Sequence, residues 1–374
     1  MTSRERLLAV LRRETPDTVP VFVKGVSPFG ENMNFMGRFD ESYERLRRLV
    51  YDTADIFHPV GFDTGTFLSA GIPLETRIIR EDADWRDVES TIETPAGPLT
   101  SVTRSSRHNQ YEVMTVKFWL ESMDDFERLM RLPYRPVRPA VAEVMARKDS
   151  EVGERGLPYV GIPSVIMFMH VLLGSEGLAT WSVMHRERLR ELVEIFSVRV
   201  LEYVKHLLSE GAGPVFSYAG PELAVPPLMS PRDFHEFVTI PDKPVHELIH
   251  ASGFYTWVHS HGRLDEVLEE FAEMGADILE PLEVPPGGNV TLSEAKSRIG
   301  QQVVLMGNMP YDALIYWPAE KIQAKVESDC RAAMKGGGFI MMPAASPFEP
   351  VLSDTGFEGY RAYIEAGRRY GRYS

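Results

Sequence analysis

Short apolar runs alternate with amphipathic runs along most of the chain. Runs bounded by turn residues predict buried strands at residues 19–25, 159–162 with 165–168, 215–218, 254–258, 277–279, 303–306 and 339–342. Helical spacing of apolar positions predicts helices at residues 3–13, 40–57, 187–210, 231–252 and 264–274. This alternation predicts a parallel sheet, and the number of units favours a closed (β/α)8 TIM barrel over a doubly wound open sheet.

A different pattern interrupts the series between about residues 74 and 120. Short β-prone pieces lie at residues 76–80, 90–94, 99–103 and 112–116, and Pro95-Ala96-Gly97-Pro98 supplies a turn. We therefore expect an antiparallel β insertion in the α/β series. No flexible linker divides the chain, so residues 1–374 are expected to form one domain.

Composition narrows the classes of function. The chain has 44% hydrophobic and 25% charged residues, as ordinary globular proteins do. No apolar run approaches the ~18 residues that span a bilayer, which predicts a cytoplasmic protein without a membrane role. The formal charge of −14 argues against binding to nucleic acid, whose phosphates need a basic face. Cys330 is the only cysteine, which excludes an internal disulfide and a cysteine-based zinc cage.

Polar side chains follow several predicted strands. His259 and His261 end one strand, and Glu280 and Glu283 follow the next. Residues two apart on a strand point to the same face, and the carboxyl ends of parallel strands converge on one site. The two imidazoles either form hydrogen bonds in a polar pocket or bind a metal together with Glu280 or Glu283. Two imidazoles and one carboxylate suit Zn²⁺ with an open position.

Other strand ends and motifs add candidates. Lys24 lies at the exit of the first strand, and Asn308 follows the strand at 303–306. His246-Glu247-Leu248-Ile249-His250 matches the H-E-x-x-H pattern of zinc peptidases, but an outer helix with a solvated histidine face is the favoured interpretation. Gly336-Gly337-Gly338 lacks the lysine of a phosphate loop and is better explained as a helix stop.

Several motifs together resemble the uroporphyrinogen decarboxylase superfamily. They are Arg4-Glu5-Arg6-Leu7-Leu8 with Pro16-Asp17-Thr18-Val19-Pro20, Ser230-Pro231-Arg232-Asp233-Phe234, His259-Ser260-His261-Gly262, Leu279-Glu280-Pro281 and Leu305-Met306-Gly307-Asn308. Their order and spacing cover nearly the whole chain. The resemblance implies a single (β/α)8 barrel with its site at the carboxyl ends of the strands.

The sequence departs from both main branches of that superfamily. Decarboxylases carry Met-Arg-Gln-Ala-Gly-Arg after the first strand, whereas this chain has Val23-Lys24-Gly25-Val26-Ser27-Pro28. Corrinoid-dependent zinc methyltransferases bind zinc through His-x-Cys and a late cysteine. Here His259 matches the histidine, His261 takes the cysteine's place, and no ligand lies near Ala345. The related cobalamin-independent methionine synthases add a glutamate, which falls near Glu280 or Glu283.

The resemblance implies a methyltransferase that moves a methyl group between a small methylated substrate and a corrinoid protein. Zinc would act as Lewis acid. The expected catalytic residues are His259, His261, Glu280 and Asn308, of which the first three would bind the metal. The expected pocket residues are Lys24, Tyr218, Glu222, Arg263 and Glu283.

Two alternatives stay open. One is a cofactor-free decarboxylase of a porphyrinogen-like or other acidic substrate, in which Lys24 and Arg263 hold carboxylates. The other is a non-catalytic binding protein on the same barrel. A homodimer is a further open expectation.

Overall fold

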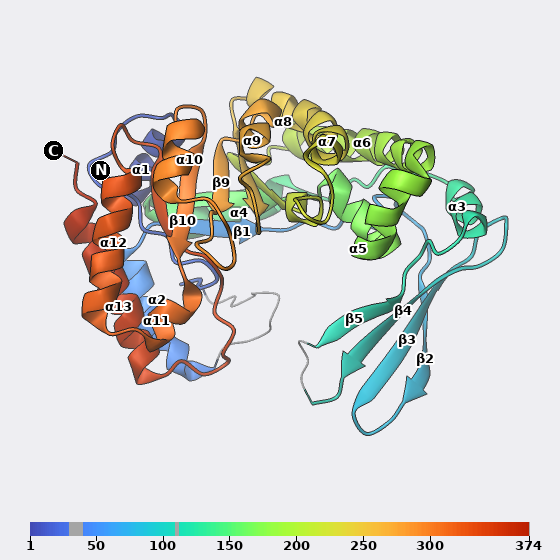
Figure 1. Cartoon of the computed structure of the whole chain (residues 1–374), viewed down its shortest axis with the longest axis horizontal. Helices are drawn as coiled ribbons and strands as arrows, with labels where there is room; N and C mark the ends of the chain where they lie inside the picture. Colours follow the sequence, from blue (N-terminus) through green and yellow to red (C-terminus); the bar gives the residue numbers. More distant parts are fainter. Residues whose placement is uncertain (30–39, 109–111, 374) are drawn as a thin grey trace.

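Parallel strands form the centre of the molecule (Figure 1). The computed structural model describes residues 1–29, 40–108 and 112–373. Seven parallel strands pair with one another in chain order. They are β1 (Ile56–Val60), β6 (Gly156–Gly161), β7 (Val215–Ala219), β8 (Tyr255–Ser260), β9 (Ile278–Pro281), β10 (Val304–Met309) and β11 (Phe339–Pro343).

Residues 21–22 join the two edges of this sheet. Val21 bridges Met341 of β11 in parallel, and Phe22 bridges Asp55, next to β1. The Phe22 amide donates to the Met341 carbonyl at 2.9 Å, and the Asp55 amide donates to the Val21 carbonyl at 2.8 Å. The N-terminal segment is therefore the eighth member of the ring, and the predicted (β/α)8 arrangement is confirmed.

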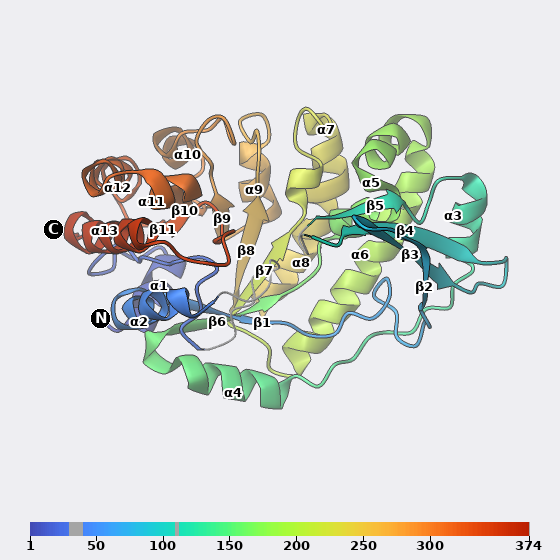
Figure 2. The same ribbon diagram turned by 90° about the horizontal axis from the view of Figure 1, so that it is seen from below.

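Helices surround the strands, as Figure 2 shows from a second direction. The N-terminal helices are α1 (Ser3–Leu11), α2 (Glu44–Thr53), α3 (Met123–Met130), α4 (Ala142–Val152), α5 (Val165–Met184) and α6 (Arg186–Ser209). The later ones are α7 (Pro231–Phe234), α8 (Ile240–Ala251), α9 (Leu268–Met274), α10 (Leu292–Arg298), α11 (Tyr311–Tyr316), α12 (Ala319–Ala333) and α13 (Asp354–Tyr370). Helix α1 begins with a capping box in which the Thr2 side chain and Glu5 satisfy each other's amide groups.

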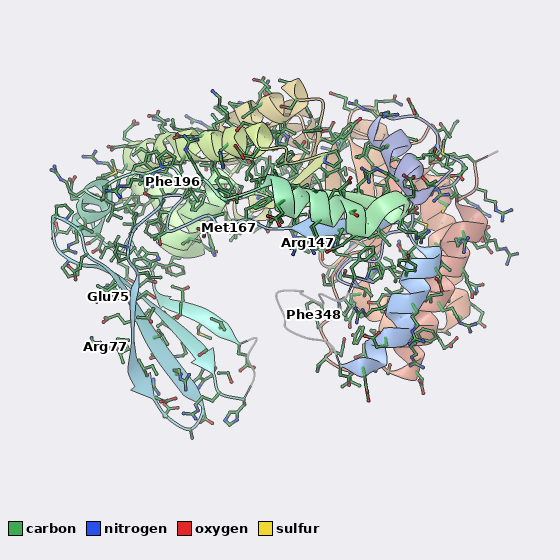
Figure 3. All side chains as sticks on the ribbon, turned by 180° about the vertical axis from the view of Figure 1, so that it is seen from behind. Glu75, Arg77, Arg147, Met167, Phe196 and Phe348 are labelled. Atoms are coloured by element: carbon green, nitrogen blue, oxygen red, sulfur yellow. The ribbon has the colours of Figure 1, made fainter. Side chains whose placement is uncertain are left out.

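A second, antiparallel sheet is inserted after β1. Its strands pair in the order β2 (Glu75–Glu81), β3 (Trp85–Ile92), β4 (Leu99–Ser106) and β5 (Val113–Lys117), which confirms the predicted insertion. The sheet projects away from the barrel (Figure 1). Figure 3 shows Glu75 and Arg77 of this sheet in the lower half of the view. Phe348, in the loop after β11, also lies there.

The barrel interior has its own apolar cluster, separate from the layer between strands and helices. Its buried members are Leu7, Val10, Leu11, Phe22, Phe57, Leu157, Val215, Trp257, Ile278, Val304, Met306, Ile340 and Met342. The first three come from α1, which precedes the first strand segment and so fills the amino end of the barrel. The interior is therefore closed at that end, and a ligand has access from the carboxyl ends of the strands.

Two predicted elements were wrong. Residues 40–57 were expected to be helical throughout, but α2 ends at Thr53 and Ile56 begins β1. Residues 165–168 were expected to be a strand, but they form the first turn of α5, which the Ser164 side chain caps by accepting from the Met167 amide. A short apolar run has too few residues for its periodicity to show whether it forms a strand or a helix.

Helix α5 bears on the membrane prediction. Among the described residues it is the one helix long and apolar enough to cross a membrane by length and composition, although Glu176 and other polar residues interrupt its apolar run. Within its most apolar window 56% is buried inside the fold, as in core helices of globular proteins. Gly174 interrupts the helix at a φ of 69°, where a side chain would collide with the Phe118 ring.

Candidate functional site

A cavity of about 550 Å³ opens at the carboxyl ends of the barrel strands. Its polar lining includes Lys24, Ser217, His259, His261, Glu280 and Ser346. Four aromatic side chains, Phe22, Phe57, Tyr159 and Trp257, also line it. The rings pack against one another, with the Trp257 centroid 4.9 Å from that of Tyr159 and 5.2 Å from that of Phe57. The volume falls within the range of small-molecule sites.

Lys24, His259 and Glu280 form one cluster in this cavity. The Lys24 ammonium donates to Oε1 of Glu280 at 3.0 Å and to Oε2 at 2.8 Å. Nδ1 of His259 lies 2.7 Å from Oε1 of Glu280 and 3.1 Å from the Lys24 nitrogen. The strands explain the meeting, because β8 and β9 pair with His259 opposite Glu280.

The Glu280 carboxylate is buried and ionised. The residue is 1% exposed. Burial alone would raise its pKa, but the charges and hydrogen bonds of His259 and Lys24 outweigh that effect and lower the pKa to about 2. The cavity therefore contains a buried anion that two neighbouring nitrogen groups hold in place.

His261 and Glu283 form a second histidine–glutamate pair beside that of His259 and Glu280. Nδ1 of His261 lies 2.9 Å from Oε2 of Glu283. Burial of His261 opposes protonation, but the hydrogen bond and charge of Glu283 raise its pKa above the ordinary value. The rings of His259 and His261 are 4.4 Å apart and nearly perpendicular. The expectation that both histidines reach one site is met, because both line the cavity.

The two imidazoles fit a metal better than the predicted carboxylate does. Metal-binding histidines usually donate one ring N–H to a carboxylate and bind the metal with the other nitrogen. His259 and His261 each use Nδ1 for a glutamate, and within residues 1–29, 40–108 and 112–373 neither Nε2 has a hydrogen-bond partner. Such a pair of nitrogen donors suits Zn²⁺. Both oxygens of Glu280 already accept from Lys24, so a ligand role for Glu280 requires Lys24 to move.

Asn308 lies behind the site. It is buried, and its Nδ2 donates to the Leu282 carbonyl at 3.0 Å while its Oδ1 accepts from Lys325 at 2.8 Å. It does not line the cavity. The geometry thus assigns Asn308 to the support of the segment between Glu280 and Glu283, in place of the predicted contact with substrate.

Of the remaining predicted pocket residues, Tyr218 lies in the cavity wall as expected, whereas Glu222 and Arg263 do not. Tyr218 contributes to the cavity wall, but its hydroxyl is hydrogen-bonded to His246 of α8. Glu222 accepts from the Gly220 amide at 2.9 Å, which closes its own turn. Arg263 is exposed. Neither Glu222 nor Arg263 lines the cavity.

The H-E-x-x-H segment lies on α8, away from the cavity lining, as the barrel interpretation predicted. The expectation of a solvated histidine face was wrong for His246, which is fully buried. Its Nδ1 lies 2.7 Å from Oγ1 of Thr256, and burial lowers its pKa to about 3. Nε2 of His250 lies 2.7 Å from Asp277.

The predicted metal set of His259, His261 and Glu280 does not bring three ligand atoms within 4.8 Å of one another, whereas a different group among the described residues does. It consists of His235, in the segment between α7 and α8, with Glu270 and Glu273 of α9. Nδ1 of His235 lies 2.8 Å from Glu270, which raises the His235 pKa. The cluster is partly exposed and does not line the cavity.

The aromatic lining of the cavity was not predicted from the sequence. Phe22 precedes Lys24 by two residues, and Trp257 precedes His259 by two. Because side chains two apart on a strand share a face, counting back from each polar candidate would have found them. Tyr159 stays protonated beside the cluster, because burial and the Glu280 charge raise its pKa to about 12.

A family profile and a solved structure match most of the chain. The profile of the family described as uroporphyrinogen decarboxylase (URO-D) matches residues 115–370. Curated proteins give no significant match. A solved methyltransferase from Methanosarcina mazei is 17% identical and matches with a TM-score of 0.61 over 99% of each chain. D-psicose 3-epimerase from Clostridium cellulolyticum H10 matches with a TM-score of 0.34 and 9% identity, over 61% of this chain and 83% of that chain.

Proposed function

Since the chain belongs to the uroporphyrinogen decarboxylase family, we propose that it is an enzyme that moves a methyl group between a small methylated substrate and a corrinoid protein. The fold shared with the Methanosarcina mazei methyltransferase over nearly all of both chains supports this reaction class. The family name alone would favour decarboxylation. The pair of imidazoles in the cavity favours methyl transfer, because two such nitrogen donors suit a metal-assisted reaction.

The observation that carries the proposal is the pair of carboxylate-held imidazoles. His259 and His261 each present Nδ1 to a glutamate within 2.9 Å, and their rings lie 4.4 Å apart in one cavity. Zinc bound there would supply a Lewis acid that polarises the heteroatom bonded to the methyl group. His259 and His261 would hold it through Nε2, and Glu280 and Glu283 would fix the orientation of the rings.

The other cavity residues would bind and shield the substrate. The rings of Phe22, Phe57 and Trp257 give the interior an apolar wall that excludes water from the reacting groups. The Tyr159 hydroxyl, with a pKa raised to about 12, stays a hydrogen-bond donor at neutral pH. Lys24 neutralises Glu280 and keeps this buried carboxylate ionised.

A methyl-transfer assay tests the proposal. Purified protein is reconstituted with zinc and mixed with cob(I)alamin and a panel of methoxylated and methylated-amine compounds, and methylcobalamin formation is followed by absorbance. We expect transfer from at least one donor and its loss in His259→Ala. Failure with every donor, together with the absence of zinc binding, would contradict the proposal and favour a non-catalytic binding protein.

One observation favours cofactor-free decarboxylation as a second candidate. Lys24 places an ammonium group in the cavity, where it could hold a substrate carboxylate. Its charge is already paired with Glu280, and Arg263, the second predicted carboxylate binder, is not in the lining. Product analysis with porphyrinogens and other acidic substrates in metal-free buffer separates this reaction from methyl transfer.

A further inference from the structure

We propose that His235, Glu270 and Glu273 form a site for a divalent metal ion such as Mn²⁺ on the outside of the barrel. The ion would join the π-helical turn His235–Thr239, between α7 and α8, to α9 and so stabilise the fold. This inference goes beyond the proposed function and does not depend on it, because none of the three side chains lines the cavity.

Two buried rings fix the backbone that carries the three side chains. Phe234 directly precedes His235, and its ring packs against that of Phe271 of α9 with centroids 5.5 Å apart. Both rings are fully buried. Glu270 and Glu273 are three residues apart on α9 and therefore lie on one face of that helix. The apolar core thus holds the imidazole and the two carboxylates beside one another.

The distances suit a single ion. Each of the three side chains offers one ligand atom, and these atoms lie within 4.8 Å of one another. Nδ1 of His235 is 2.8 Å from Oε2 of Glu270. Ligand atoms bound to one metal at about 2.0–2.2 Å lie about 3–4 Å apart. Rotation of the exposed Glu273 side chain is therefore enough to complete the set.

The cluster has more negative than positive charge. The hydrogen bond and charge of Glu270, with the charge of Glu273, raise the pKa of His235 against the opposing effects of burial and Lys243. Within residues 1–29, 40–108 and 112–373, Glu270 forms an ion pair with His235 alone, and Glu273 forms none. A divalent ion would neutralise both carboxylates. It would compete with the proton on Nδ1, so its affinity should fall at low pH.

The donor set and its exposure define the kind of site. Imidazole suits first-row transition metals, and carboxylates suit Mn²⁺ in particular. The His235 side chain is 40% exposed and Glu273 is exposed, so the ion exchanges freely with the solvent. Such an ion is lost when the protein passes through a gel-filtration column, and its binding has to be measured at equilibrium.

The chain offers a matched control in His250. Its Nε2 lies 2.7 Å from Asp277, and its side chain is 39% exposed, close to the value for His235. Among the described residues this pair has no third ligand atom close enough to hold an ion. A His250→Ala variant therefore removes a comparable histidine–carboxylate pair without removing a metal ligand.

An equilibrium titration with Mn²⁺ tests the inference, because the six-line electron paramagnetic resonance signal of the free ion disappears on binding. The titration uses His261→Ala, in which the cavity lacks one imidazole, so that the outer site is measured alone. We expect binding that weakens at least about tenfold when His235→Ala or Glu273→Gln is added, and that His250→Ala leaves unchanged. No binding, or equal binding with and without His235→Ala, would overturn the inference.

Thermal unfolding supplies a second measurement. An ion that binds only the folded chain raises Tm, and we expect a rise of about 2–5 °C with saturating Mn²⁺ in the unmodified protein. The rise should be smaller in His235→Ala, should persist in His250→Ala, and should shrink between pH 8 and pH 5 as protons compete for Nδ1. Equal changes in Tm in all three proteins would overturn the inference.

The proposed function and this inference can fail separately. A protein that transfers no methyl group but keeps a His235-dependent response to Mn²⁺ contradicts the proposed function and supports the outer site. A protein that transfers methyl groups without a His235-dependent response to Mn²⁺ supports the proposed function and overturns the outer site.

Discussion

The Lys24 ammonium lies 2.8 Å and 3.0 Å from the two oxygens of Glu280, although 256 residues separate them in the chain. The pair joins the first strand segment of the barrel to β9 across the cavity. It makes Glu280 an ionised group in a buried position, which is stable only while its partners remain.

Removal of that charge should destabilise the fold. Glu280→Gln leaves the Lys24 ammonium without its counter-ion and His259 without a charged acceptor. Because removing one partner of a buried pair leaves the other uncompensated, we expect a loss of about 2–4 kcal/mol in the free energy of unfolding, measured with urea. The more exposed Glu283→Gln is the control and should lose less. Equal stability of Glu280→Gln and the unmodified protein would contradict the electrostatic account.

Substitutions in the two pairs of histidines should affect zinc binding differently. His261→Ala removes a cavity nitrogen and should abolish zinc binding at micromolar concentration, as determined by metal analysis after gel filtration. His250→Ala should retain zinc and lose only about 1 kcal/mol of stability, because its single hydrogen bond to Asp277 is on the outer helix. The reverse ranking would favour the peptidase interpretation of His246 and His250.

His246 should matter for stability and not for the site. It is fully buried and contacts both Tyr218 and Thr256. His246→Ala removes a hydrogen-bond partner of the Tyr218 hydroxyl and leaves a cavity, while Thr256 keeps its contacts with Gly275 and Asp277. We therefore expect a loss of about 2–4 kcal/mol in urea unfolding with zinc binding retained. A loss below about 0.5 kcal/mol, as at a surface position, would contradict this placement.

Asp242 should make stability depend on pH. It is buried on α8, its Oδ2 has no hydrogen-bond partner in the described part of the chain, and burial raises its pKa to about 7. The folded state therefore binds more protons than the unfolded state between about pH 4 and 7, and the stability contributed at low pH is lost as pH rises through this window. Asp242→Asn should remove the loss, so its advantage should grow with pH by up to about 1.4 kcal/mol per unit. A constant difference between pH 5 and 8 would contradict the assignment.

Most of the parallel strands could be predicted from the sequence, because their apolar runs recur regularly along the chain. Six later strand regions and the segment around Val21 were recognisable because buried parallel strands are continuous apolar runs between turn residues. Strand β1 was missed because it starts three residues after α2 ends and contains His58 and Pro59. Its identity depends on pairing with β6, which no local pattern reveals.

Site residues that follow a strand could be predicted from the sequence. Contacts that depend on how distant elements pack together could not. His259, His261 and Glu280 were recognised because they follow apolar strands. Lys24 was expected to bind substrate, and its pairing with Glu280 could not be foreseen, since it depends on closure of the barrel between β11 and β1. The burial of His246 was likewise invisible, because it depends on how α8 packs against β7 and β8.

X-ray absorption at the zinc edge tests the central claim that His259 and His261 hold a metal in a site without sulfur. The only cysteine, Cys330, is buried on α12, and burial raises the pKa of its thiol to about 12. The account predicts nitrogen and oxygen neighbours at about 2.0–2.1 Å, with the outer-shell pattern of two imidazoles, and loss of that pattern in the His259→Ala and His261→Ala variants. A sulfur neighbour at about 2.3 Å, or an unchanged imidazole pattern in both variants, would contradict it.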